Sequence, residues 1–303
     1  MKALYSGVSG MRSHQTKMDV IGNNIANVNT NGYKSQRTTF RDVYYQQIKS
    51  PTNPGDDGAG TVRGGTNSAQ VGYGAQVGSI DTIHTLSGYT PTNKQTDVYI
   101  NGEGYIKVQT PNKDTFYTRM GALNFDQDGN LVDISGSSVM GWNITGYGTA
   151  PDYVPVYEDG KTDDPREVSP LIIANFKDFK NITINADGTI SGTTKVDLTT
   201  PAAPAETIVT IGQIAIANIP NNNALILEGN SYYRAGNNAG DITYEEPGTG
   251  GTGALVTGGL EMSNVDLANE FSEMIVTQRG FQANTKIISV VDQMLEELVN
   301  LKR

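Results

Sequence analysis

Apolar residues recur at helical spacing at both ends of the chain, and this feature restricts the fold more than any other. From Leu4, positions alternately four and three residues apart are Leu4, Val8, Met11, Gln15, Met18, Gly22 and Ile25, five of them apolar. A period close to 3.5 residues predicts an amphipathic helix with one apolar stripe. The pattern ends in segment 27–32, where Asn and Gly favour helix-ending conformations.

The C-terminal end repeats this pattern over a longer stretch. The same spacing gives Leu267, Phe271, Met274, Gln278, Phe281, Thr285, Ile288, Asp292, Leu295 and Val299. A second apolar row joins it late, at Ile287, Val291, Met294, Leu298 and Leu301. Ser263, followed three residues later by Asp266, fits a capping box at the start of this helix.

The middle of the chain has the signature of short strands separated by turns. Segments 97–100, 105–108, 181–184 and 211–219 are rich in Val, Ile and Tyr and are expected to be strands. Turn signals separate them at Asn101-Gly102, Asp128-Gly129 and Asp187-Gly188. Segment 51–65 is predicted to be an exposed loop. Segment 248–259, with six Gly, is predicted to be a hinge before the last helix.

The two terminal stripes need partners, because a single amphipathic helix is marginal in water. The helices can cover each other only in part, so other copies of the chain are expected to cover the wide C-terminal face. The sequence thus predicts an α+β fold with both helices paired as a coiled-coil domain beside a mainly β body. The expected parts are a coiled-coil domain (1–32 with 260–303), an extended linker and loop region (33–75), a β-rich domain (76–142 with 181–259) and a small insert or extension (143–180).

Composition excludes several classes of function. The chain has no Cys, which excludes a disulfide framework, a thiol nucleophile and Cys-based metal sites. Its two His, His14 and His84, have no second His or Cys near them in the sequence. The net charge of -10, without a Lys/Arg cluster, argues against nucleic acid and anionic membranes. No apolar run approaches the ~18–20 residues of a membrane span, and the N-terminus lacks the apolar core of a signal peptide. We expect no catalytic, cofactor or metal site.

Short motifs at both ends carry a family resemblance. One stretch is Ala3-Leu4-Tyr5-Ser6-Gly7-Val8-Ser9-Gly10-Met11, and a second contains the motif residues Asn23, Asn24, Ile25, Ala26, Asn27, Gly32, Tyr33 and Lys34. Near the C-terminus are segment 260–267 and a second group of motif residues, Gln278, Arg279, Phe281 and Asn284. Segments 101–105, 118–121 and 141–142 also match. Together they resemble the bacterial flagellar rod and hook protein family over most of the chain, least between 143 and 180.

Two branches of that family are the alternatives. Segments 264–271, 298–303 and 70–80 are most similar to hook members, and distal rod members share most of the other motifs. The chain is short for a hook member, so the outer insert domain of that branch is expected to be small or missing. A hook member would form a flexible tube that transmits torque as a universal joint. A distal rod member would belong to the flagellar basal body.

The resemblance implies a structural protein that polymerises with itself into a helical tube around an export channel. It also implies that the coiled coil is the inner domain of the tube and that the mainly β body is the outer part. Family members leave the cell through the flagellar export apparatus without a cleaved signal peptide, which implies an extracellular position in the flagellum. The implied partners are the distal rod protein and the hook–filament junction protein at the tube ends, with the hook cap and the export apparatus during assembly. No nucleic acid and no membrane insertion are implied. Contacts in the coiled coil and between subunits are expected at Leu4, Val8, Met11, Met18, Ile25, Leu267, Phe271, Met274, Phe281, Ile288, Leu295 and Val299.

Other classes of protein fit the residues less well. A secreted hydrolase needs a carboxylate pair or a nucleophile with its base, and no motif marks either. An extracellular adhesin would be a monomer that binds a surface ligand, whereas the flagellar interpretation predicts tubes. Without the family motifs, the apolar rows would fit ordinary core helices equally well.

Overall fold

The computed structural model describes residues 2–56, 62–147, 155–157, 168–173, 176–195, 198–199, 202–203 and 208–301. The chain forms two compact units. The helical unit comprises Met1–Asn27, Ser35–Ile83 and Val265–Arg303, and the β unit comprises Val28–Lys34 and His84–Asn264. Helices at the two ends with a mostly β middle confirm the predicted α+β class.

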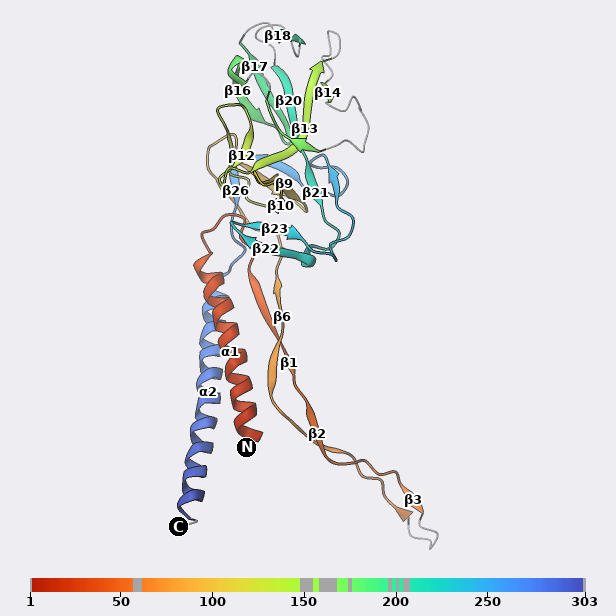
Figure 1. Ribbon diagram of the computed structural model, residues 1–303, viewed down its shortest axis with the longest axis vertical. Helices are drawn as coiled ribbons and strands as arrows, with labels where there is room; N and C mark the ends of the chain where they lie inside the picture. The colour runs from red at the N-terminus through yellow and green to blue at the C-terminus, as the bar shows by residue number, and fades with distance from the viewer. Residues whose placement is uncertain are drawn as a thin grey trace. The chain divides into compact units, whose positions relative to one another are not determined.

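The helical unit contains the two expected helices, α1 (Lys2–Ala26) and α2 (Leu267–Asn300). They lie side by side and antiparallel (Figure 1). The predicted capping box is wrong in detail, because Asp266 itself is the N-cap residue of α2. Its carboxylate accepts hydrogen bonds from the backbone N–H groups of Ala268 at 2.9 Å and Asn269 at 3.4 Å, which satisfies two of the unpaired donors at the helix start.

A two-stranded antiparallel ribbon completes the helical unit. Its nested pairs are β1 (Gln36–Asp42) with β6 (Ala75–Thr82), β2 (Tyr45–Lys49) with β5 (Ala69–Gly72), and β3 (Gly55–Asp56) with β4 (Val62–Arg63). Residues 33–75, expected to be an extended linker, are therefore largely paired strands. Most of the ribbon's described side chains are exposed, so its alternation of buried and polar positions is weak. That alternation is the usual sequence signal for a strand.

The β unit is built on a sheet whose main path runs β16-β17-β20-β13-β9-β10-β23-β22. The strands of the unit are β7 (Tyr89–Pro91), β8 (Val98–Asn101), β9 (Tyr105–Gln109), β10 (Thr115–Thr118), β11 (Leu123–Phe125), β12 (Leu131–Asp133), β13 (Ser138–Tyr147), β14 (Pro155–Tyr157), β15 (Ser169–Pro170), β16 (Phe179–Ile184), β17 (Thr189–Thr194), β18 (Leu198–Thr199), β19 (Ala202–Ala203), β20 (Ile208–Ile214), β21 (Ile216–Asn218), β22 (Leu225–Gly229), β23 (Tyr232–Ala235), β24 (Thr243–Glu245), β25 (Ala254–Thr257) and β26 (Gly259–Glu261). Short 3-10 helices lie at Phe176–Asp178 and Asn222–Ala224.

The core of the β unit combines strands that the sequence predicted, such as β9 and β20, with strands that it did not predict, such as β13 and β17. Fully buried side chains include Ile106, Val108, Ile190 and Ile214, which come from β9, β17 and β20. Trp142, the one Trp of the chain, is also buried, on β13. Alternating apolar residues thus fold into strands because one face of each strand enters this core.

The predicted hinge at 248–259 is wrong over much of its length. Residues 254–257 form β25, which pairs with β8 along its full length, and Leu255 is only 1% exposed. A glycine turn at 249–251 does precede β25, with positive φ at Gly250 and Gly251. Leu255 is the buried side chain of β25, and the strand forms beside β8 despite the glycines around it.

The predicted insert at 143–180 is described only in part, because 148–154, 158–167 and 174–175 lie outside the described residues. Its described strands extend the main sheet. Strands β14 and β15 both pair with β13, and β16 pairs with β17. The boundaries proposed for the inner, linker, β-rich and insert parts stay a prediction.

Candidate assembly interface

Glycines allow α1 and α2 to approach closely. A Cβ atom added at Gly10 would lie 2.8 Å from Asn284 Nδ2, and one added at Gly280 would lie 2.7 Å from the His14 ring. Gly7 faces Ile288 in the same way, at 3.3 Å. Contacts under about 3.4 Å leave no room for a larger side chain without a shift, so the helix spacing depends on these small residues.

Polar groups fix the register of the pair. Lys17 Nζ lies 2.8 Å from Glu273 Oε2. Asn24, buried at the end of α1, donates from Nδ2 to Glu270 Oε1 at 2.9 Å and to the Gln36 carbonyl at 2.8 Å. Its Oδ1 accepts from the Gln36 N–H at 2.9 Å. The motif residue Asn24 therefore connects α1, α2 and β1 through a single amide, which can satisfy this many partners.

The face of α2 toward α1 is shifted from the predicted row. Met274, Phe281 and Ile288 are half-buried as that row required, but Gln278 and Thr285 are exposed. Thr277 is buried in their place, and Asn284 and Val291 are half-buried. The predicted row counted apolar residues, whereas the true seam uses small and polar ones where the helices are closest.

Several residues predicted to form contacts are exposed in the single chain. Leu267, Phe271, Leu295 and Val299 of α2 are exposed by 39%, 51%, 43% and 67%. Residues predicted on α1 are all half-buried, namely Leu4, Val8, Met11, Met18 and Ile25. Large apolar side chains gathered on one helix in this way indicate a surface for another molecule. Their role between subunits stays a prediction.

The remaining motif residues of α1 and α2 lie at the helix surfaces. Asn27 Nδ2 donates to the Asn23 carbonyl at 2.9 Å and to Asn23 Oδ1 at 3.0 Å, one turn before. Ala26 and Gln278 are exposed, and Arg279 Nη1 donates to Gln282 Oε1 at 3.3 Å. The Asn23–Asn27 contact satisfies the carbonyl of Asn23 near the end of α1.

A buried ion cluster in the β unit brings three motif segments together. Lys34 Nζ lies 2.5 Å from Glu261 Oε1 and donates to the Thr85 carbonyl at 2.7 Å. Arg119 Nη1 lies 3.6 Å from Glu261 Oε2, and Nη2 donates to the Gly102 carbonyl at 3.0 Å. The side chains of Lys34, Arg119 and Glu261 are at most 1% exposed. Two buried cations thus share one buried carboxylate.

The backbone around this ion cluster is equally constrained. Gly32 has φ +71°, and a Cβ there would lie 3.1 Å from the Met120 nitrogen. Its N–H donates to the Glu261 carbonyl at 2.9 Å, and the following Tyr33 is buried. Only glycine combines this conformation with such a close approach at little cost, which gives the Gly-Tyr-Lys motif a structural reason.

Aromatic and imidazole groups surround the cluster. The Arg119 guanidinium lies 5.0 Å from the Tyr105 ring centroid, and the Tyr105 hydroxyl lies 2.8 Å from His84 Nδ1. Burial, with the positive charges of Lys34 and Arg119, lowers the pKa of His84 to about 4. Burial also raises the pKa of Tyr105 to about 12 and lowers the pKa of Lys34, although Glu261 opposes the latter shift.

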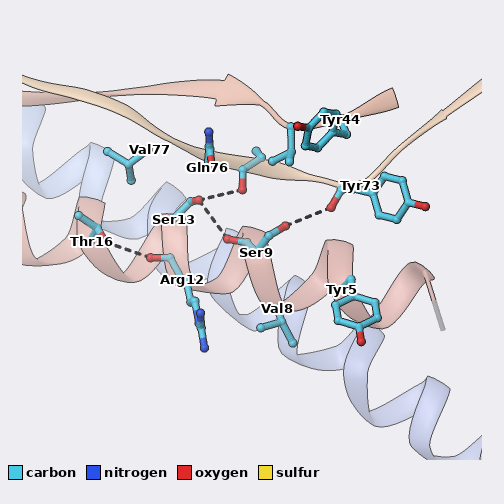
Figure 2. A pocket seen from close by; sticks show the side chains of 12 residues that line it. Tyr5, Val8, Ser9, Arg12, Ser13, Thr16, Tyr44, Tyr73, Gln76 and Val77 are labelled. Carbon is cyan, nitrogen blue, oxygen red and sulfur yellow. Dashed lines mark hydrogen bonds between the residues drawn. The ribbon is translucent and has the colours of Figure 1, made fainter. Parts of the chain in front are cut away.

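An open groove of about 790 Å³ runs along α1 in the helical unit. We call it the α1 groove. Figure 2 shows Tyr5, Val8 and Arg12 on its helix side and Tyr44, Tyr73 and Val77 on its strand side. Ser13 Oγ donates to the Ala75 carbonyl at 3.1 Å, which holds the strand against the helix. A Cβ at Gly74 would lie 2.1 Å from Ser9 Oγ, so this contact also needs glycine.

Among the residues that the structure describes, no group of three or more His, Asp and Glu side chains could hold a metal ion. None of the helices in this part of the chain is long and apolar enough to cross a membrane.

Comparisons with known proteins place the chain in a family. Residues 4–34 match the family described as "Flagella basal body rod protein" and residues 256–301 match "Flagellar basal body rod FlgEFG protein C-terminal". Residues 99–192 match "Flagellar hook protein FlgE/F/G D1 domain". The matched terminal regions contain α1 and α2, and the third contains much of the main sheet.

Two rod proteins and one hook protein are among the relatives that match over the whole chain. The flagellar basal-body rod protein FlgG of Bacillus subtilis is 42% identical over 304 positions, covering 100% of both chains. FlgG of Borreliella burgdorferi is 33% identical over 304 positions, covering 100% of this chain and 99% of the relative. The flagellar hook protein FlgE of the same organism is 30% identical over 446 positions, covering 100% of both chains. The chain therefore belongs to the family of flagellar rod and hook axial proteins, which are structural subunits that polymerise into axial structures.

Arg119 and Glu261 lie in the motif segments 118–121 and 260–267, but the sequence did not predict them as site residues. A signal was available, because each is a charged residue set among apolar or small neighbours in a segment that resembles the family. The sequence could not show that Glu261 lies beside both Lys34 and Arg119 in the folded chain.

Proposed function

We propose that this chain is a rod subunit of the flagellar basal body, the distal rod member that the sequence analysis held as its alternative. The preference of the sequence motifs for the hook branch is thereby reversed. The observation that carries the proposal is length. Rod relatives align over 304 positions with this chain of 303 residues, whereas the hook relative needs 446. More than a hundred positions of the hook relative have no counterpart here.

In this proposal the terminal helices form the inner layer of a tube and the β unit forms the outer part. The exposed apolar residues of α2, including Phe271, Val276 and Leu298, are then covered by neighbouring copies. Burying one such side chain contributes about 1.5–3 kcal/mol. Several per subunit, repeated around a tube, suffice to offset the loss of freedom on association.

The partners follow from that position. The chain contacts other copies of itself along the rod and the hook protein at the outer end. It leaves the cytoplasm through the flagellar export apparatus, and the assembled rod lies outside the cytoplasm. The subunit is structural and has no catalytic role.

A deletion strain distinguishes the rod from the hook. Cells that lack this chain are expected to stop assembly at a shortened rod, seen by electron microscopy of isolated basal bodies, and to recover hooks when the wild-type chain is restored. A complete rod without a hook would instead support the hook alternative. A tagged copy found along the hook would refute the proposal in the same way.

The contact role of the helices has its own test. Leu267→Asp, on the exposed face of α2, and Phe281→Asp, on its α1 face, are expected to abolish polymerisation. Fluorescence of Trp142 should show that the β unit stays folded. Ser289→Asp, at an exposed polar position of α2, is the matched control. Tubes of normal length formed by both apolar-to-Asp variants would exclude a role for these residues in assembly.

A further inference from the structure

The C-terminal end of α2 extends beyond the N-terminus of α1. In the antiparallel pair Gly7 faces Ile288, and Val291 is the last half-buried residue of α2. Residues 292–301 are all exposed, and we call them the α2 overhang. The overhang includes large apolar side chains, with Met294, Leu298 and Leu301 exposed by 52%, 62% and 82%. It cannot fold back on its own chain, because α2 is one continuous helix.

The α1 groove is the matching unfilled surface of the same unit. Its helix wall runs from Tyr5 to Thr16, and its rim carries exposed aromatic rings, Tyr5 at 66% and Tyr44 at 77% (Figure 2). The twelve residues of this wall span roughly 18 Å, and the ten residues of the overhang span roughly 15 Å. The lengths therefore agree to about one helical turn.

Charge also matches between the two surfaces. Arg12 lines the groove and makes no ion pair with any residue that the structure describes. The overhang carries Asp292, Glu296 and Glu297, which likewise have no ion pair with described residues, and no Lys or Arg up to residue 301. Opposite charges that lack partners within the chain favour a contact between chains and steer its orientation.

We propose that the α2 overhang of one copy docks in the α1 groove of a second copy. Met294 and Leu298 enter between Val8 and Tyr44, and the overhang carboxylates face Arg12. This inference rests on the proposed function and specifies one contact of its polymer. Because groove and overhang are different surfaces, the contact is heterologous, and a docked pair of copies keeps one unfilled groove and one free overhang. In the open arrangement proposed here the contact repeats from copy to copy and extends a filament along the helix axis.

Cysteine cross-linking tests this contact directly, because the natural chain has no Cys. Val8→Cys combined with Leu298→Cys is expressed as the only copy, and isolated basal bodies are oxidised and run on a non-reducing gel. The expected result is a ladder of covalent dimers, trimers and longer multimers. Val8→Cys combined with Ser289→Cys, which places the second thiol outside the overhang, is expected to remain monomeric.

Every other result is informative. Normal rods that give no ladder overturn the groove contact and leave the proposed function standing. Cross-linking that stops at the dimer indicates a closed contact between two copies. A cross-link to a different flagellar protein identifies another occupant of the α1 groove. Either result overturns the inference. If wild-type cells carry this chain outside the rod, the proposed function fails first and the inference fails with it.

Charge-reversal variants test the same contact if the double-Cys chain does not assemble. Arg12→Glu and Glu296→Arg are each expected to raise the concentration needed for polymerisation about fivefold, the effect of an exposed pair near the upper end of its usual range. The combined variant should return to within about twofold of wild type. If the two single effects multiply in the combined variant, Arg12 and Glu296 do not meet and the proposed orientation is wrong.

Discussion

Neutralising Glu261 should destabilise the β unit more than any other single change in the ion cluster. In Glu261→Gln the side chain keeps its shape, but Lys34 and Arg119 lose the buried carboxylate that lies 2.5 Å and 3.6 Å from them. Glu103 cannot replace it, because its side chain is 58% exposed and lies 3.8 Å from Arg119 alone. Two buried cations would remain without a buried counter-charge.

The size of the effect follows from these distances. At an effective dielectric constant of 20, the two attractions amount to roughly 7 and 5 kcal/mol, and burying the ions offsets most of this gain. Removing one partner of a buried pair leaves the burial cost uncompensated, which typically destabilises by about 3–5 kcal/mol. For a unit of this size that corresponds to a Tm lower by roughly 6–20 °C.

The assay uses the single Trp of the chain, Trp142, which is buried in the β unit and reports its unfolding by fluorescence in urea. Lys34→Met is the comparison, because it leaves one cation and one anion. It should cost less than Glu261→Gln, and adding Lys34→Met to Glu261→Gln should recover stability. An unfolding free energy for Glu261→Gln within about 1 kcal/mol of wild type would refute the reasoning, as would a larger loss for Lys34→Met.

The loss of stability in Glu261→Gln should also depend on pH in a defined direction. Burial holds the pKa of Lys34 below its ordinary value of 10.5 in the folded chain. Below 10.5 the unfolded chain binds a proton that the folded chain holds less tightly, so stability falls as pH falls toward the folded pKa. Without Glu261 this shift becomes larger, because the attraction that opposed it is gone. The Glu261→Gln deficit should therefore be greater at pH 6 than at pH 9.

Three further predictions concern other parts of the molecule. Gly10→Leu should prevent the helices from packing at Asn284 and reduce rod assembly measured by electron microscopy, whereas Gly22→Ala, with no atom within 4 Å of the added carbon, should assemble normally. Asn24→Ala should lower the thermal stability of the assembled helical unit, followed by circular dichroism, by about 1–3 kcal/mol, because buried partners lose hydrogen bonds. Burial lowers the pKa of His84 to about 4, so the side chain is neutral in the folded chain and its contribution to stability is full above about pH 6.5. The free energy of unfolding should fall by about 1–2 kcal/mol between pH 6.5 and pH 4, after allowance for the partial exposure of His84. In His84→Gln the urea midpoint should depend less on pH across that range.

The elements that the sequence predicted well are those with a strong period. The α1 and α2 bounds agree with the apolar rows to within a few residues. Strands β8, β9, β16 and β20 lie at segments predicted from their Val, Ile and Tyr content, although the predicted segment 211–219 is divided between β20 and β21. The ribbon formed by β1 to β6 was missed because both of its faces are largely exposed, so no alternation marks it. Strand β25 was missed because the surrounding glycines suggested a hinge.

The seam between the helices shows a different limit. A search for apolar residues at a 3.5-residue period finds Phe271 and Val299, which are exposed, and passes over Gly10, Gly280 and Asn284, where the backbones are closest. Close helix contact selects small residues, and an apolarity count cannot detect them. The apolar rows therefore mark the surface left for other molecules at least as much as the contact within the chain.

Local sequence patterns could not predict which distant charged residues pair in the folded chain. Lys34 and Glu261 are separated by 227 positions in the chain, and nothing in either neighbourhood specifies the other. Their motifs nevertheless resemble one family, and the structure supplies the reason: Lys34, Arg119 and Glu261 must be present together, because any one charge buried alone would be costly. Segments that resemble a family at three distant places are thus explained by one buried site. The motif residues Lys34, Arg119 and Glu261 thus pair their charges within the β unit, whereas contact with a neighbouring subunit is the role proposed for the exposed apolar residues of α2.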